Sequence, residues 1–429
     1  MTGEIPVLLS GFFSCMKGSV GMSRTNTNSL VRGKILPSLL GFALPVLLAL
    51  FLQAMYGAAD LIIVGRFAGI SEQSGVASGS QLLNLLTMVL TGLTMGVTVF
   101  VGNAIGAGKR QQAGQGVGTG VAIFAAVAAA VTAGVVPFGD VLAGWMHAPA
   151  QAFEQTSAYI RICGAGTVFI TAYNVLGAIF RGLGDSKTPL LTVAIACVIN
   201  ILGDLLLVAG LGLGAAGAAI ATVAAQGISV LCSLYLLKRR GLPFAFSWRS
   251  IRFDGLCTRR ILLVGFPIAL QELLVQFSFL FIQVVVNGMG VAQSAAVGVA
   301  EKVCVFLMLV ASAYMQAISA FVAQNNGAGR SDRSRQALTY GIRTALGAGA
   351  VMGALAFFGG AWLAAVFSRE PLVIANAHEY LKAYAIDCLL TAVLFCFLGY
   401  FNGCGRTVFV MLQGIVGAFC VRIPVVYLM

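Results

Sequence analysis

Charged side chains are scarce in this chain, since only 9% of its 429 residues are charged and 59% are hydrophobic. A soluble domain carries roughly a quarter charged residues, so the composition excludes an ordinary soluble protein and indicates a polytopic membrane protein. Acids are the rarer sign, with 14 Asp and Glu against 26 Lys and Arg. The basic residues lie in loops between apolar runs, so their excess over the acids reflects the orientation of the protein in the membrane. No nucleic-acid partner is therefore expected.

Patterns that hold a metal or a nucleophile are also missing. The two histidines, His147 and His378, are far apart, and the ten cysteines form no C-x-x-C pair. This excludes the usual iron–sulfur and zinc motifs. A membrane-embedded enzyme would need a cluster of metal-binding or nucleophilic residues, and the two histidines are too few and too far apart to form one. We therefore expect a protein that is not an enzyme and has no cofactor. Glycine, in contrast, is abundant with 53 residues, which is typical of helices that pack closely in lipid.

Eleven apolar segments are each long enough to cross a bilayer at about 20 residues per helix. They are predicted at 36–64, 75–104, 116–138, 156–180, 188–209, 214–237, 260–287, 292–323, 337–367, 379–402 and 407–429. Alternate loops are rich in Lys and Arg, above all the loop between residues 238 and 260. These loops fall on one side, which predicts a cytoplasmic N-terminus in a multi-pass protein of the plasma (inner) membrane.

The sequence repeats itself in two halves. Ile105-Gly-Ala-Gly-Lys109 resembles Asn326-Gly-Ala-Gly-Arg330 at an offset of 221 residues (326 − 105). Phe180-Arg-Gly-Leu-Gly184 resembles Phe401-Asn-Gly-Cys-Gly405 at the same offset (401 − 180). The fold class predicted is therefore all-α, with two pseudo-symmetric six-helix bundles related by an axis along the membrane normal.

The repeat sets the domain boundaries that we expect. They are an N-terminal segment 1–34, which is cytoplasmic or disordered, an N-lobe 35–238, an inter-lobe loop 239–259 and a C-lobe 260–429. By the repeat, twelve helices are expected, and the chain ends inside the eleventh, before a partner of the sixth helix. Residues 1–21 are expected to be disordered or an over-extended start, because Met22 precedes a more typical N-terminal stretch.

Two acids stand inside apolar runs of the first half. Asp60 lies near the end of the first run and Asp204 near the end of the fifth. A carboxylate in hydrocarbon is costly and is by default a functional hypothesis. Both runs cross the membrane in the same direction, so the two acids should lie at similar depth. Two neighbouring carboxylates in a low dielectric resist double ionisation, so the pair could hold a proton or a sodium ion.

Polar residues accompany both acids. Tyr56 precedes Asp60 by four residues and Asn200 precedes Asp204 by four, so each shares its acid's helix face. Neither acid has an acidic counterpart in the second half, since Asp60 maps to Ile282 at an offset of 222 residues (282 − 60), as Pro45 does to Pro267, and Asp204 maps to Val425 at an offset of 221 (425 − 204). The alternative is structural: each acid tethers a helix end, and Tyr56, Asn200, Asn174 and Thr222 join helices by hydrogen bonds.

The second half carries other ionisable residues in its apolar runs. Glu272 and Asp387 are candidates for a second cation site or a substrate contact, or for structural roles. Glu301 and Lys302 are expected to satisfy each other as an ion pair, with Lys302 snorkelling.

An ordered set of motifs resembles the multidrug and toxic compound extrusion family of secondary transporters. The set comprises Gln53-x-x-Tyr56-x-x-x-Asp60, Gly102-Asn-Ala-Ile-Gly-Ala-Gly-Lys109, Arg181-Gly-Leu-Gly-Asp-Ser-Lys-Thr-Pro189, Asn200-x-x-x-Asp204, Gly214-Ala-Ala-Gly-Ala-Ala-Ile-Ala-Thr222 and Ala323-Gln-Asn-Asn-Gly-Ala-Gly-Arg330. The resemblance covers roughly residues 35–429 and is carried by the order of the motifs.

The resemblance implies a V-shaped pair of bundles around a central cavity that alternates between inward- and outward-facing states. It implies export of cationic amphipathic drugs driven by entry of protons or sodium, by a monomer surrounded by membrane lipids. The implied cation-coupling residues are Tyr56, Asp60, Asn174, Asn200, Asp204 and Thr222, with Gln53 nearby. The residues that we expect to line the substrate cavity are Gln53, Glu272 and Asp387. No metal is expected apart from sodium at Asp60 and Asp204.

Other readings of the sequence are weaker. A lipid-linked oligosaccharide flippase of the same superfamily would line its cavity with arginines, whereas the arginines of the apolar runs, chiefly Arg161, Arg343 and Arg422, lie near helix ends. A channel is disfavoured by the two-lobed repeat, which suits alternating access.

Overall fold

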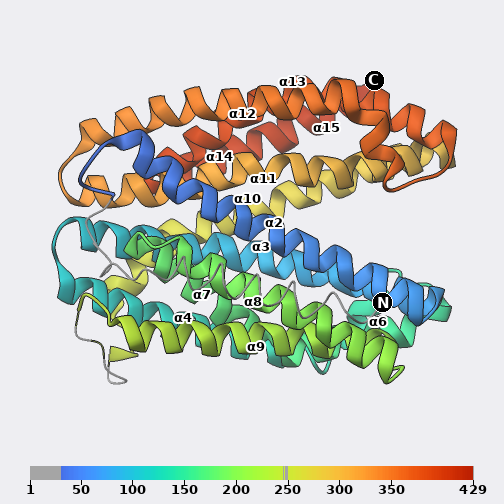
Figure 1. Ribbon diagram of the computed structural model, residues 1–429, viewed down its shortest axis with the longest axis horizontal. Coiled ribbons are helices and arrows are strands. Elements are labelled where there is room, and N and C mark those ends of the chain that lie inside the picture. The colour runs from blue at the N-terminus through green and yellow to red at the C-terminus, as the bar shows by residue number, and fades with distance from the viewer. Residues whose placement is uncertain (1–29, 245, 247–249, 429) are drawn as a thin grey trace, which may run out of the picture.

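The computed structural model describes residues 30–428 except 245 and 247–249, and the expectation for residues 1–21 falls outside that range (Figure 1). Within the described residues the fold is helical and contains no strand. The helices are α2 (Ile35–Phe67), α3 (Ile70–Gly106), α4 (Arg110–Val135), α5 (Gly139–Trp145), α6 (Phe153–Ala165), α7 (Thr167–Leu183), α8 (Lys187–Asp204), α9 (Gly214–Arg240), α10 (Gly255–Gly288), α11 (Val291–Gly327), α12 (Ser331–Ala365), α13 (Pro371–Gly403), α14 (Thr407–Ile415) and α15 (Ile423–Leu428).

All eleven predicted spans are present among the described residues, ten as single long apolar helices and one as a bent pair. The prediction of one continuous helix at 156–180 is wrong, because α6 and α7 meet at a bend of 53°. Gly166 lies at this bend, and a Cβ added there would clash with the side chain of Val223. Close contact with α9 therefore accompanies the break between α6 and α7.

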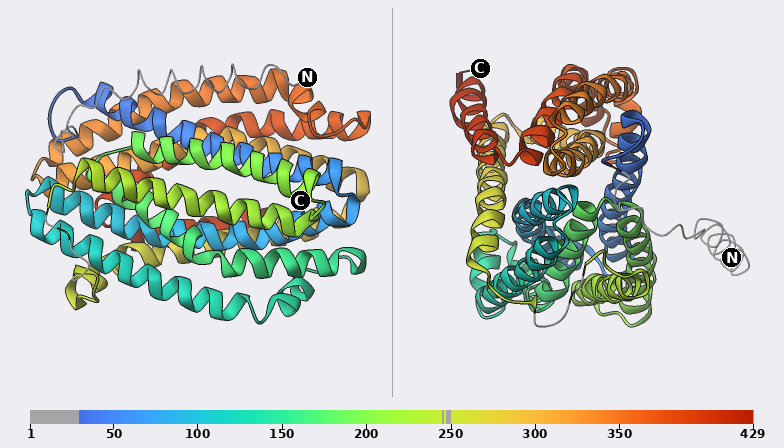
Figure 2. Two further views of the ribbon diagram at one scale, coloured as in Figure 1. Left: turned by 60° about the horizontal axis from the view of Figure 1, so that its bottom comes forward. Right: turned by 90° about the vertical axis from the view of Figure 1, so that its left-hand side faces the viewer.

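Two bundles are visible when the structure is viewed end-on (Figure 2, right). The helices from α3 to α9 form the N-lobe, and α11 to α13 form the centre of the C-lobe. Helices α2 and α10 run between the two bundles on opposite sides. This arrangement agrees with the predicted pair of lobes.

Helix α2 packs against both lobes, which its place in the sequence did not predict. In its first half, Leu39 and Phe42 are buried in a core with Phe321 of α11. In its last turns, Ile63 and Val64 join a separate N-lobe core. A rearrangement of α2 near Asp60 is therefore mechanically connected to the C-lobe.

Backbone conformation confirms the internal repeat. Gly108 and Gly329 follow corresponding helices with φ of 71° and 70°, and Gly184 and Gly405 have φ of 84° and 73°. Each is a left-handed conformation that glycine adopts without steric cost. Both pairs keep the offset of 221 residues (329 − 108 and 405 − 184).

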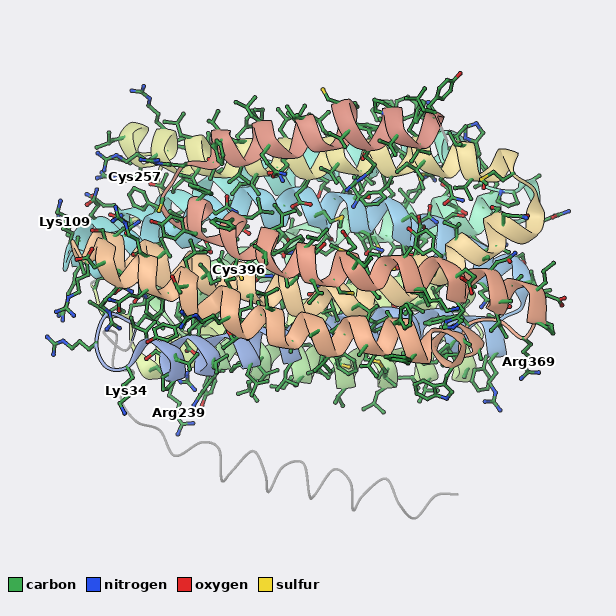
Figure 3. The ribbon with its side chains drawn as sticks, turned by 90° about the horizontal axis from the view of Figure 1, so that it is seen from above. Lys34, Lys109, Arg239, Cys257, Arg369 and Cys396 are labelled. Atoms are coloured by element: carbon green, nitrogen blue, oxygen red, sulfur yellow. The ribbon has the colours of Figure 1, made fainter. Side chains whose placement is uncertain are left out.

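One end of the molecule is basic. Lys34, Lys109 and Arg239 lie at this end and Arg369 at the opposite one (Figure 3). We call the first the basic end.

The lobes touch at the basic end. Gly106 packs on the Gln324 carbonyl, and the symmetry-related Gly327 packs on the Asn103 carbonyl. The Gln324 amide also donates to the Gly182 carbonyl at 2.8 Å. The structure is therefore closed between the lobes at this end.

Candidate functional site

Asp60 is buried in the N-lobe at the end of a chain of hydrogen bonds. Asp60 is only 5% exposed, although only 28% of the apolar part of α2 is buried. The Thr222 hydroxyl of α9 donates to Asp60 Oδ2 at 3.1 Å. The Asn200 amide of α8 in turn donates to the Thr222 hydroxyl at 3.3 Å. Three helices thus contribute to one polar cluster in an apolar surrounding.

Asp204 completes this cluster and is fully buried. It is the last residue of α8, and a π-helical turn, η2 (Leu205–Gly210), follows it directly. Its carboxylate lies within hydrogen-bonding reach of the Asp60 carboxylate. Short π-helical turns interrupt the regular i→i−4 ladder and are frequent at functional sites. The sequence prediction that Asp60 and Asp204 lie at the same depth agrees with this geometry.

The cluster has more acceptors than donors. Four oxygens lack a hydrogen-bond donor and are shielded from solvent: Asp60 Oδ1, Asn200 Oδ1 and both Asp204 oxygens. Buried polar groups are normally paired, and an unpaired one is destabilising by about 1–3 kcal/mol, more when charged. Two carboxylates cannot donate to each other unless one carries a proton. The oxygens therefore fit a bound proton, or a hard cation such as sodium, and the described residues contain no cluster of three or more His, Cys, Asp and Glu for a resident metal.

Tyr56 lies next to this cluster and is held by other partners. Its hydroxyl is within hydrogen-bonding reach of the Gln53 and Gln226 side chains. Gln53 also lines a cavity, so Tyr56 is close both to Asp60 and to a residue of that cavity. Of the nine residues predicted from the sequence, Asp60, Asn200, Asp204 and Thr222 form the centre, and Tyr56 and Gln53 connect it to the cavity.

Asn174 belongs to the cavity and not to the carboxylate cluster. Its amide donates to the Ile170 carbonyl at 2.8 Å, and its carbonyl oxygen accepts from the Thr91 hydroxyl at 3.4 Å. The cavity lies mainly within the N-lobe, between α2, α3, α7, α8 and α9, and Gln316 of α11 closes one side. It contains about 80 Å³ of space for the centres of water-sized molecules.

The acids of the C-lobe are separate from this cavity. The Thr391 hydroxyl, one helical turn after Asp387, donates to Asp387 Oδ2 at 3.0 Å. Neither Asp387 nor Glu272 lines the cavity that contains Gln53. Glu301 and Lys302 form no ion pair, and the prediction that they satisfy each other is wrong, because adjacent residues on a helix point in different directions.

The start of α3 supports the site from the end opposite the basic end. Glu72 accepts a hydrogen bond from the Ala215 amide in the first turn of α9 at 2.7 Å. The neighbouring Gln73 donates to the Leu61 carbonyl, one residue after Asp60, at 3.2 Å. These two side chains hold α9 and α2 in place relative to each other, near the segments that contain Thr222 and Asp60.

Sequence reasoning missed this support and one cavity residue. Arg181 was assigned to the loop after the fourth span, but it lies within α7 and lines the cavity. Its spacing of four from Gly177 and eight from Tyr173 places all three on one helix face. Tyr173 is next to the predicted site residue Asn174, so this shared helix face was a sequence signal that could have indicated Arg181. No sequence signal links Glu72 to α9.

Comparisons with known proteins identify the family. The MatE family model matches residues 45–206 and 267–428, one match in each half of the repeat. A relative from Bacillus subtilis, described as a probable multidrug resistance protein, is 24% identical over 396 residues, which is 92% of this chain and 88% of the relative. A relative from Shewanella oneidensis, described as an FAD transporter, is 30% identical over 214 residues, covering 48% of this chain and 46% of the relative.

A solved structure shows the same fold. It is described as the outward-facing conformation of a multidrug resistance MATE family transporter of the MOP superfamily. It superimposes with a TM-score of 0.88 at 21% identity and covers 95% of this chain and 91% of the solved one. Together with the paired matches to the family model, this shows that the chain belongs to the MatE family of multi-pass membrane transporters and is not an enzyme.

Proposed function

We propose that the chain is an antiporter in which a proton or a sodium ion binds between Asp60 and Asp204 and drives export of cationic amphipathic drugs. The observation that carries this proposal is the set of four buried oxygens without a donor around two adjacent carboxylates. Two adjacent buried carboxylates are costly on their own, whereas a bound cation would neutralise charge and pair with the acceptors. Binding and release of the ion would therefore be coupled to the structure around α2.

The orientation follows from charge. With the basic end in the cytoplasm, the lobes are closed towards the cytoplasm in the present structure. The ion would then enter from outside, down its electrochemical gradient, in the outward-open state. N-terminal residues before α2 would be cytoplasmic.

Helix α2 is the element that would transmit ion binding. It carries Asp60 beside Ile63 and Val64 of an N-lobe core and Leu39 in a C-lobe core, and Pro45 lies between Leu39 and Asp60 in the sequence. Proline removes one backbone hydrogen bond and lets a helix bend. A change in charge at Asp60 would bend or straighten α2 beyond Pro45, alter the cavity beside Gln53 and Asn174, and release the drug outward.

Lipid flipping is less consistent with the cavity. A lipid pyrophosphate needs several cationic side chains, and Arg181 is the single arginine or lysine among the described residues that line this cavity. Glu272 and Asp387 would contact substrate only if the drug also extends into the C-lobe.

Transport in proteoliposomes tests the proposal. Vesicles containing the protein and loaded with an ethidium-like dye receive either a proton gradient or a sodium gradient, for the wild type, Asp60→Asn and Asp204→Asn. We expect dye movement under one of the gradients and its loss in both variants. Dye movement that persists in Asp204→Asn with an unchanged response to the gradient would refute coupling at this site.

A further inference from the structure

An arginine without an anionic partner faces the cavity of the N-lobe. Arg181 lies within α7, two helical turns from Asn174, at a distance along the axis of roughly 10 Å. Its Nε is buried without a hydrogen-bond acceptor, while other parts of its side chain line the cavity. Within the described part of the chain, no carboxylate forms an ion pair with it.

The nearest acid in the sequence is already engaged. Asp185 accepts hydrogen bonds from the Lys187 and Thr188 amides, both at 3.0 Å, and so caps the start of α8. It also forms an ion pair with Arg240 of α9 at 3.2 Å. Asp185 therefore does not compensate the charge of Arg181.

The surroundings of Arg181 resemble a site for an anionic oxygen group. Tyr173, Ser186 and Ser233, which carry hydroxyl groups, line the same cavity. The cavity's space of about 80 Å³ exceeds the roughly 10–15 Å³ that one water needs, so several waters or one small polar group would fit. A whole drug would not fit in this space.

We propose that Arg181 binds a carboxylate or phosphate group of the transported molecule, so that the preferred substrates carry an anionic group in addition to their cationic part. This rests on the proposed function, because it assigns a second contact to the same transport cavity. The guanidinium would form charge-assisted hydrogen bonds with the anionic oxygens, which are stronger than those between neutral groups. Asp60 and Asp204, which do not line this cavity, would remain the site of the coupling ion.

A matched pair of dyes tests the proposal. The probes are a rhodamine with a free benzoate, which is zwitterionic, and the methyl ester of the same dye, which is cationic. Equilibrium binding to the purified full chain in detergent is measured by fluorescence polarisation, without any ion gradient. In the wild type, we expect the free acid to bind about tenfold more tightly than its ester, from one net hydrogen bond to a charged group.

Variants separate a binding role from a structural one. In Arg181→Gln the preference for the free acid should disappear while binding of the ester changes less than about twofold, and Arg181→Lys should restore part of the preference. Arg343→Gln on α12 removes the same charge from an exposed position and should keep the wild-type preference.

Two results would overturn the proposal. One is equal binding of both dyes to the wild type, which is expected if a free inorganic anion occupies Arg181. The other is a parallel loss of both dyes in Arg181→Gln, which would show that Arg181 only maintains the fold. Gradient-driven movement of the ester by the wild type is measured separately, so failure of antiport is distinguishable from failure of the anion contact.

Discussion

Replacing Asp204 by asparagine should stabilise the protein while it abolishes coupling. Asp204 is fully buried, and both its oxygens lack a donor. An asparagine of nearly the same shape removes one buried charge. Its Nδ2 group would also lie near two further acceptors without a donor, Asp60 Oδ1 and Asn200 Oδ1. Since an unpaired buried group is destabilising by about 1–3 kcal/mol, we expect a gain in unfolding free energy of that size.

The gain depends on the ion content of the site. It should be largest in sodium-free alkaline solution, where the wild-type carboxylates are left without a cation. Acid solution, or sodium if that is the coupling ion, should stabilise the wild type by binding to its folded state and so reduce the difference. Thermal unfolding of both proteins in detergent, across pH and with or without sodium, measures this effect.

A control separates this effect from the mere loss of an acid. Asp140 is also an acid of the N-lobe, but its side chain is 58% exposed and forms an ion pair with Arg161 at 2.6 Å. Asp140→Asn should therefore change stability by less than about 1 kcal/mol, and in the unfavourable direction. If Asp204→Asn were less stable than the wild type under every condition, the carboxylate would have structural partners, and the reasoning from unpaired oxygens would be refuted.

Three further predictions concern the supports of the site and the contact between lobes. Gly106→Ala would clash with backbone at the basic end and should speed hydrogen–deuterium exchange at the ends of α3 and α11, whereas Gly134→Ala, which meets no neighbour, should not. Glu72→Ala removes the acceptor for the first turn of α9 and should lower stability by about 1 kcal/mol in thermal unfolding, and Glu72→Gln, which keeps an acceptor, should lose less. Asp185→Ala removes two capping bonds and an ion pair and should lower stability by about 1–2 kcal/mol, and an unchanged melting temperature would contradict the capping role.

The fold could be predicted from the sequence because lipid imposes a simple pattern. Long apolar runs mark the spans, and the repeated glycines at 108 and 329 mark corresponding turns that need a left-handed backbone. The bend between α6 and α7 was missed because it accompanies close contact of Gly166 with Val223 of another helix, which no local pattern contains. The division of α2 between two cores was missed for the same reason.

The centre of the site could be predicted because a buried acid is rare in an apolar helix. Asp60 and Asp204 stand out by composition, and the spacing of Asn200 places it on the correct face. Arg181 was missed because a basic residue at the end of an apolar run resembles an ordinary loop cation. The spacing from Tyr173 and Gly177 indicates the shared helix face, and the tertiary structure adds that this face lines the cavity and that Asp185 is engaged elsewhere.

The most direct test of ion coupling at Asp60 and Asp204 is the release of the ion when the drug binds. Affinities of two coupled ligands change reciprocally, so a drug that competes with the ion must release it. Purified protein in weakly buffered detergent solution is mixed with ethidium, and released protons or radioactive sodium are counted per bound dye. The account predicts release of about one ion by the wild type and none by Asp60→Asn or Asp204→Asn. Equal release by wild type and both variants, or dye binding by the wild type without any ion release, would contradict it.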